Sequence, residues 1–250
     1  MTLDWSPLDT ELALWGDAGL TLPLWWRDDD ATAHTHALDR LHDMAVATGL
    51  PVHLAVIPEP ATPALAEYTR DREALIPVIH GWAHRNHQNP ISKKAEFGAD
   101  RPTEAALADA KRGLDRMRDL FGDHLSPMFV PPWNRISEEV ITGLPQLGYR
   151  TLSTFTPRKT QEAAPGLERI NTHLDPIDWR GSRGLVIPDA LIGQLAANLR
   201  ERREGRADND EPYGILTHHL VHDDAIWQFT QEIVTRLLQG PGQPWTAPRQ

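Results

Sequence analysis

The stretch LTLPLWWRDDD, residues 20–30, joins an apolar run to three consecutive carboxylates. Residues 20–27 have the apolar and aromatic composition of a buried strand, so the acidic triplet falls at the predicted strand end. Adjacent like charges repel each other, and a folded protein either leaves such a run in water or neutralises it with a cation. The triplet is therefore either a solvated acidic turn or part of a metal site.

Short apolar runs alternate with helical patterns along the rest of the chain. Further strands are predicted at 52–57, 75–82, 128–131, 149–155, 167–173 and 213–218, and helices at 37–48, 61–69, 103–121, 137–147, 188–203 and 225–238, with Thr103 as an N-cap. This alternation is typical of a parallel α/β sheet with right-handed crossovers. A barrel is favoured over an open sheet because the chain has 250 residues and no G-x-G-x-x-G turn.

Composition excludes several classes of function. The chain has 25 Lys and Arg against 35 Asp and Glu, a net charge of −10, and no basic block, so we expect neither a nucleic-acid nor a membrane partner. It has no cysteine, which leaves His, Asp, Glu and water as metal ligands. The first 15 residues lack the features of a signal peptide, so we expect a cytoplasmic protein. The oligomeric state stays open.

Polar residues follow five of the predicted strands. They are Asp28, Asp29 and Asp30 after the first, His80, His84 and His87 after the third, Trp133 and Asn134 after the fourth, Asp175 and Asp178 after the sixth, and His218, His219 and His222 after the last. In a parallel barrel the carboxyl ends of the strands share one rim, where active sites lie. We therefore expect these groups to converge.

Two histidines and one carboxylate make a common facial metal set, in which an open position remains for water. The segment HGWAH places His80 and His84 four residues apart, and Asp29 could supply the carboxylate. His84 and His87 would also share a face if this segment were helical. The spacing does not decide between the two histidine pairs.

The motif order resembles that of the polysaccharide deacetylase (NodB-homology) superfamily, also called carbohydrate esterase family four. That family has the motifs T-F-D-D-G, H-[S/T]-x-x-H, R-x-P-[Y/W], D-x-x-D-W and L-x-H. Here the corresponding segments are WRDDD (26–30), HGWAH (80–84), VPPWN (130–134), DPIDW (175–179) and LTH (216–218), in the same order. The resemblance spans residues 26–218.

This resemblance implies a distorted (β/α)7 barrel in a single domain over residues 1–250, with its core at about 20–240. It implies a hydrolase of N-acyl carbon–nitrogen bonds that uses a divalent metal, first of all zinc, with cobalt, nickel or manganese as alternatives. The carried-over roles are general base for Asp28, metal ligands for Asp29, His80 and His84, general acid for His218, and tuning of that acid for Asp178. The substrate site would involve Trp82, Trp133, Asn134, Arg135 and Trp179, with backbone near Trp133 at the oxyanion. The alternative role for each tryptophan is packing in the hydrophobic core.

The chain departs from the family pattern at three positions: Val130 replaces the third-motif arginine, Asp30 a glycine and Gly81 a serine or threonine. In the family, the third-motif arginine is the usual partner of the general base. We therefore expect another arginine of this chain to pair with Asp28. Neighbours on a strand point to opposite faces, so Arg135 is favoured over Arg27. These departures favour a small or intracellular N-acyl substrate. The alternatives are a non-catalytic barrel that binds a carbohydrate or metabolite, and a hydrolase of a cyclic amide or ester.

Overall fold

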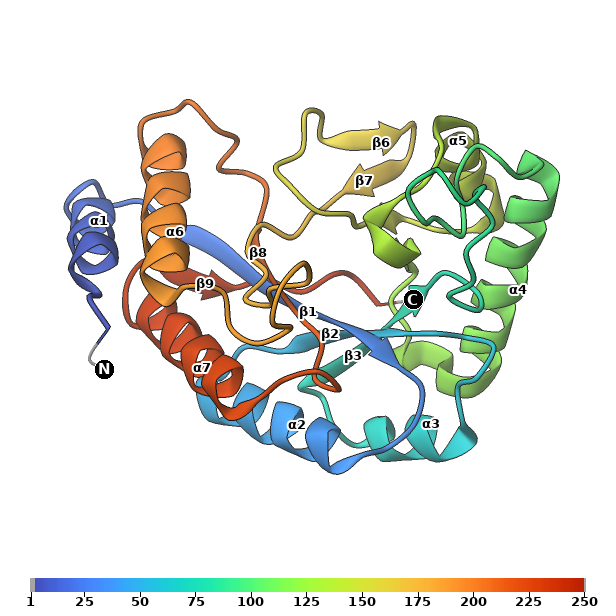
Figure 1. The fold of residues 1–250 in the computed structure, drawn as a ribbon, viewed down its shortest axis with the longest axis horizontal. Helices are drawn as coiled ribbons and strands as arrows, with labels where there is room; N and C mark the ends of the chain where they lie inside the picture. Colours follow the sequence, from blue (N-terminus) through green and yellow to red (C-terminus); the bar gives the residue numbers. More distant parts are fainter. Residues whose placement is uncertain (1–2, 250) are drawn as a thin grey trace.

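Seven parallel strands form a distorted (β/α)7 barrel in the structure, a computed structural model that describes residues 3–249 (Figure 1). The strands are β1 (Leu22–Ala31), β2 (Val52–Val56), β3 (Leu75–His80), β4 (Met128–Val130), β5 (Thr151–Leu152), β7 (Leu167–Arg169) and β8 (Tyr213–Thr217). The sheet order is β6-β7-β5-β4-β3-β2-β1-β8, in which β6 is the short strand Glu162–Ala164. The predicted barrel is therefore confirmed.

The segment after β7 links the two ends of this sheet. Thr172 forms a parallel bridge with Phe155 beyond β5, and Leu174 forms one with Ile215 of β8. The amide of Leu216 donates to the carbonyl oxygen of Leu174 at 2.8 Å. Two short strands were not predicted: β6 (Glu162–Ala164) pairs antiparallel with β7, and β9 (Gly242–Pro244) pairs with the start of β1.

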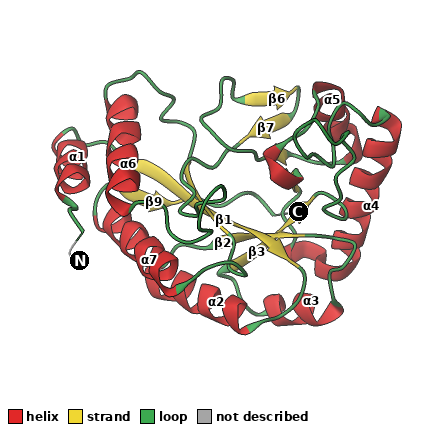
Figure 2. Cartoon of the chain, viewed as in Figure 1, coloured by secondary structure: helices red, strands yellow, loops and turns green. Residues whose placement is uncertain are grey.

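Helices surround the barrel on its outer side (Figure 2). They are α1 (Ser6–Asp17), α2 (His36–Thr48), α3 (Pro63–Arg70), α4 (Thr103–Phe121), α5 (Glu138–Leu147), α6 (Pro188–Arg203) and α7 (Asp224–Gln239). All except α1 were predicted, and α1 packs against α6. The predicted N-cap at Thr103 is wrong, because Pro102 is the N-cap and Thr103 is the first helical residue. No helix in residues 3–249 is long and apolar enough to cross a membrane.

Alternate residues of each strand face two different apolar clusters. Trp25, Ala55, Val78, Met128 and Val130 belong to the cluster inside the barrel. Their strand neighbours, such as those at 24, 26, 54, 56, 79 and 129, belong to the larger cluster between strands and helices. This period of two sets the direction of the side chains on β1 as far as Asp29, where the register shifts.

Candidate active site

A cavity of about 640 Å³ opens at the carboxyl ends of the strands. The residues that line it are Asp29, Asp30, His80, His84, Trp133, Asn134, Arg135, Phe155, Asp175, Ile177, Trp179, Arg180, Arg183, Leu216 and His218. All five predicted strand ends contribute to this list, although His87, His219 and His222 do not. Of the predicted site residues, Asp28, Asp178 and Trp82 do not line the cavity.

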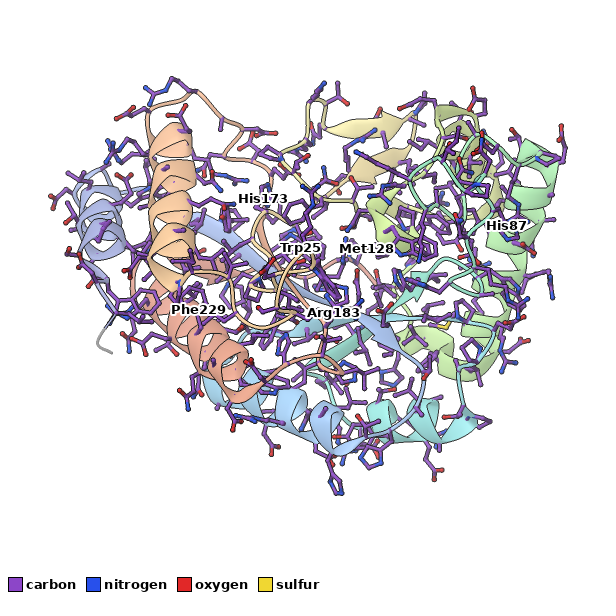
Figure 3. The ribbon with its side chains drawn as sticks, viewed as in Figure 1. Trp25, His87, Met128, His173, Arg183 and Phe229 are labelled. Atoms are coloured by element: carbon purple, nitrogen blue, oxygen red, sulfur yellow. The ribbon has the colours of Figure 1, made fainter. Side chains whose placement is uncertain are left out.

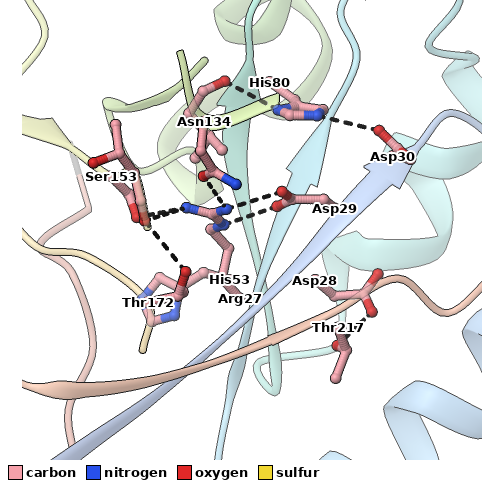
Figure 4. Close-up of polar contacts among 12 residues, drawn as sticks. Arg27, Asp28, Asp29, Asp30, His53, His80, Asn134, Ser153, Thr172 and Thr217 are labelled. Atoms are coloured by element: carbon pink, nitrogen blue, oxygen red, sulfur yellow. Dashed lines mark hydrogen bonds and ion pairs between the residues drawn. The ribbon is translucent and has the colours of Figure 1, made fainter. Parts of the chain in front are cut away.

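Asp29 forms a buried ion pair with Arg27 on the inner face of β1 (Figure 4). Arg27 Nε and one terminal nitrogen donate to the two oxygens of Asp29 at 2.8 and 3.0 Å. The remaining donors bond to Ser153 Oγ (2.8 Å), the Thr154 carbonyl (3.2 Å) and Asn134 Oδ1 (2.7 Å). All five guanidinium N–H groups are satisfied, so the pair is held in one orientation.

Asp30 lies beside His80 and His84, and these three residues form the group in residues 3–249 that could hold a metal ion. One oxygen of Asp30 is 3.1 Å from His80 Nε2 and 3.4 Å from His84 Nε2. Ligands about 2.0–2.1 Å from a tetrahedral zinc lie about 3.3 Å apart, so the set fits a divalent metal. His80 Nδ1 bonds to the Val130 carbonyl at 3.0 Å, which leaves Nε2 free to ligate.

A bulge brings Asp30 into the cavity next to Asp29. The pairing of β1 with β2 shifts register between Asp28 and Ala31, and Asp30 has a φ of 75°. Regular alternation would point Asp30 to the outer face, where Asp28 lies, so the bulge redirects it. The carboxylate beside the histidines is therefore Asp30, whereas the sequence prediction assigned Asp29.

Burial and neighbouring charges act in opposite directions on the pKa values of these three residues. Burial raises the pKa of Asp30, but the hydrogen bond and charge of His80 outweigh this effect and lower it. Burial lowers the pKa of His80, but the charge of Asp29 and the contact with Asp30 raise it overall. The pKa of His84 is lowered by burial and by the nearby His80.

Glu96 shapes the loop that carries His84, and no pattern in the sequence indicates this role. Its buried carboxylate accepts hydrogen bonds from the amides of Trp82 (3.1 Å), Ala83 (2.8 Å) and Arg85 (3.3 Å). Gly81 has a φ of 60°, and a Cβ there would lie 2.4 Å from Glu96 Oε2. The glycine that departs from the family motif is thus required by the loop.

Asp28 lies on the outer face of β1, away from the cavity (Figure 4). The strand register pairs it with Thr217 of β8, whose hydroxyl donates to Asp28 Oδ2 at 2.6 Å. His219 contributes its amide at 2.9 Å and Nδ1 at 2.5 Å. Burial raises the pKa of Asp28, but the charge and hydrogen bond of His219 lower it overall. Asp28 thus fixes the residues on either side of His218.

The expected ion pair between Asp28 and an arginine is not formed. Within residues 3–249, the ion-pair partner of Asp28 is His219. Arg135 donates instead to the carbonyl of Lys94 at 2.7 Å, and Arg27 binds Asp29. The prediction was wrong because alternation, which separates Arg27 from Asp28, places Arg27 on the same face as Asp29.

His218 faces the cavity together with Trp179 and Asp175. The rings of Trp179 and His218 make an edge contact at 4.6 Å. Asp175 accepts from Trp179 Nε1 at 2.8 Å, and burial raises the pKa of Asp175, partly opposed by the charge of His218. Asp178, predicted to tune His218, instead accepts from the amides of Gly181 (3.0 Å) and Ser182 (3.2 Å). Asp175, rather than Asp178, therefore shares the cavity with His218.

The remaining candidates lie apart from the cavity. His87 is exposed, and Figure 3 shows it toward the α4 side of the molecule. Trp82 packs against the core, with the Arg112 guanidinium 4.2 Å over its ring. His222 Nε2 accepts from the amide of His218 at 3.3 Å, and burial lowers the pKa of His222 to about 4.

The fold is shared with family 4 carbohydrate esterases and polysaccharide deacetylases. A family 4 carbohydrate esterase from Streptomyces lividans has a TM-score of 0.52 at 13% identity, covering 90% of this chain and 92% of the other. A CE4 esterase from Streptococcus mutans has a TM-score of 0.55 at 10% identity, with coverages of 88% and 81%. The Bc1960 peptidoglycan N-acetylglucosamine deacetylase has a TM-score of 0.53 at 15% identity, with coverages of 92% and 90%. No family model matches the sequence, and no curated protein matches it.

Proposed function

We propose that the protein is a metal-dependent hydrolase that cleaves the carbon–nitrogen bond of an N-acyl group. The metal-ligand set of Asp30, His80 and His84 shares one cavity with the Arg27–Asp29 pair, and this coexistence carries the proposal. The fold it shares with family 4 carbohydrate esterases and deacetylases supports the same reaction class. Zinc suits two imidazoles and a carboxylate, and cobalt, nickel or manganese could replace it.

Each residue has a distinct role in the proposed reaction. When bound, a divalent metal would polarise the acyl carbonyl and acidify water. Asp29, oriented by Arg27, accepts the proton of the attacking water. His218 donates a proton to the leaving amine nitrogen, and Thr217 and His219 are held by Asp28 on either side of it. This assignment moves the base and the metal ligand one residue along the chain from the sequence prediction.

The size of the cavity favours a small substrate. A volume of about 640 Å³ accommodates a small molecule or one to two sugar rings rather than a long enclosed polymer. Trp133 and Trp179 line it and offer aromatic faces to a sugar. We therefore include small N-acyl compounds and short N-acetylated carbohydrates in the proposed substrate class.

Acetate release from N-acetylated sugars tests the proposal directly. The protein is stripped with a chelator, and turnover is measured before and after zinc, cobalt, nickel or manganese is added. Metal-dependent release that is lost in Asp29→Asn would support the hydrolase. Sugar binding without turnover for every metal would instead favour the non-catalytic barrel. Turnover of esters or cyclic ureides alone would identify a hydrolase of another bond.

A further inference from the structure

Three arginines line the cavity of a protein whose net charge is −10. Arg135 comes from the segment after β4, and Arg180 and Arg183 come from one loop, residues 178–184. Within residues 3–249 none of the three forms an ion pair with a carboxylate, whereas Arg27, Arg85 and many other arginines do. Figure 3 shows Arg183 near the centre of the molecule, over the barrel.

The 178–184 loop is a compact turn. Besides the two hydrogen bonds to its side chain, Asp178 donates its amide to the carbonyl of Gly184 at 2.9 Å. A Cβ on Gly181 would lie 2.2 Å from Asp178 Oδ2, so the tight turn requires glycine there. Arg183 has a φ of 58°, a left-handed conformation that costs free energy in a non-glycine residue. The turn thus holds Arg180 and Arg183 at the cavity.

The carboxylates of the cavity have other partners. Asp29 is paired with Arg27, and Asp30 lies with the two histidines. Asp175 accepts hydrogen bonds from the amide of Ile177 at 2.9 Å and from Trp179 Nε1. Within residues 3–249, Arg180 and Arg183 therefore form no ion pair with these carboxylates, and the Arg183 guanidinium lies 5.9 Å over the ring of Trp179.

We propose that Arg180 and Arg183 bind an anionic group of the substrate, a carboxylate or a phosphate, so that the N-acyl substrate is itself negatively charged. This inference rests on the proposed hydrolase function and names its substrate class. Guanidinium groups suit such anions because their planar N–H forks donate two parallel hydrogen bonds. The two guanidinium groups make the rim locally positive, so an anion is attracted there against the net negative charge of the chain.

The test compares three sugars with the same acetamide group: N-acetylglucosamine, its 6-phosphate, and N-acetylmuramic acid, which carries a carboxylate. Binding is measured by calorimetry and acetate release by kcat/KM with metal added. The proteins are wild type, the double variant Arg180→Gln/Arg183→Gln, and Arg150→Gln, which removes one guanidinium charge from an exposed residue outside the cavity.

The wild type should bind at least one charged sugar about tenfold more tightly than the neutral one, as expected for charge-assisted hydrogen bonds. The double variant should lose this preference, and Arg150→Gln should keep it. Rising salt should reduce the preference because the rim is open to solvent. The phosphate and carboxylate sugars distinguish the two kinds of anion.

Equal binding of neutral and charged sugars by the wild type would overturn the anion site, as would equal loss of preference in Arg150→Gln. These outcomes are separable from failure of the hydrolase. Acetate released equally from all three sugars would keep the hydrolase and remove the anion site. A calorimetric preference that depends on Arg180 and Arg183, without acetate release, would keep the anion site and remove the hydrolase.

Discussion

Asp28 and Asp29 are adjacent in sequence, yet they lie on opposite faces of β1 (Figure 4). On the inner face, Asp29 meets Arg27 and opens onto the cavity. On the outer face, Asp28 meets Thr217 and His219 and is shut off from the cavity. The comparison shows that the direction of each side chain, rather than its residue type, determines which of these carboxylates reaches the cavity.

The largest expected difference between the two faces is in turnover. Asp29→Asn removes the proposed proton acceptor, and loss of a general base costs about 10²- to 10⁴-fold in rate. Asp28→Asn is the matched change on the outer face, where we expect less than about a tenfold loss because Asp28 only positions the segment around His218. Steady-state kcat for both variants, with circular dichroism as a folding check, measures the difference. A larger loss in Asp28→Asn would reverse the assignment of the two faces.

The second expected difference is in stability. Arg27→Met leaves the buried carboxylate of Asp29 unpaired, and breaking one partner of a buried pair costs about 3–5 kcal/mol. The control is Arg85→Met, which breaks the exposed Arg85–Glu59 pair and should cost about 1 kcal/mol or less. Denaturant unfolding gives both values. If the two variants were equally destabilised, Arg27 would not hold Asp29 in the way described.

A smaller effect is expected in the pH dependence of stability, through His219 on the outer face. Burial lowers the pKa of His219, but the charge and hydrogen bond of Asp28 raise it above the usual 6.5. A raised pKa in the folded state stabilises the protein fully below pH 6.5, and this contribution is lost as the pH rises through the folded-state pKa. The stability difference between wild type and His219→Gln should therefore shrink from pH 6 upward. A difference that grew with pH would contradict the charged pair.

A histidine inside the barrel should have the opposite effect on the pH dependence of stability. His53 is buried, its Nδ1 bonds to the carbonyl of Trp26, and its Nε2 accepts from the amide of Ala247 at 2.9 Å. Burial lowers the pKa of His53 to about 4. As the pH falls from 6.5 to 4, His53 takes up a proton in the unfolded chain but stays neutral in the folded protein. The free energy of unfolding should therefore fall by about 3 kcal/mol across this range. His53→Gln should flatten that slope in denaturant unfolding, and an unchanged slope would exclude His53 as its source.

Much of the fold could be predicted because its signals are local. Helix boundaries such as Pro188–Arg203 and the strand at Val52 follow from periodicity and flanking residues. The short strands β6 and β9 carry too few residues to show a period. Helix α1 was not among the predicted helices, although Leu8, Leu12 and Trp15 recur at helical spacing and are buried.

Most of the predicted site residues line one cavity, whereas Asp28, Asp178 and Trp82 do not, and the roles within the acidic triplet differ from the prediction by one residue. Trp25, Arg27 and Asp29 share the inner face by simple alternation, and this signal was present in the sequence. Two neighbouring carboxylates can both face the cavity only where the strand bulges, but which two do so depends on the pairing of β1 with β2. The contacts of Glu96 and Asp175 depend on segments that meet only in the folded barrel.

Metal content of three variants tests the central claim most directly. Asp28→Asn, Asp29→Asn and Asp30→Asn are loaded with zinc, dialysed and analysed for bound metal beside the wild type. We expect about one ion per chain in the wild type, Asp28→Asn and Asp29→Asn, and a loss of most metal in Asp30→Asn alone, since within residues 3–249 Asp30 is the carboxylate grouped with His80 and His84. Retention of metal in Asp30→Asn, together with its loss in Asp29→Asn, would contradict the assignment.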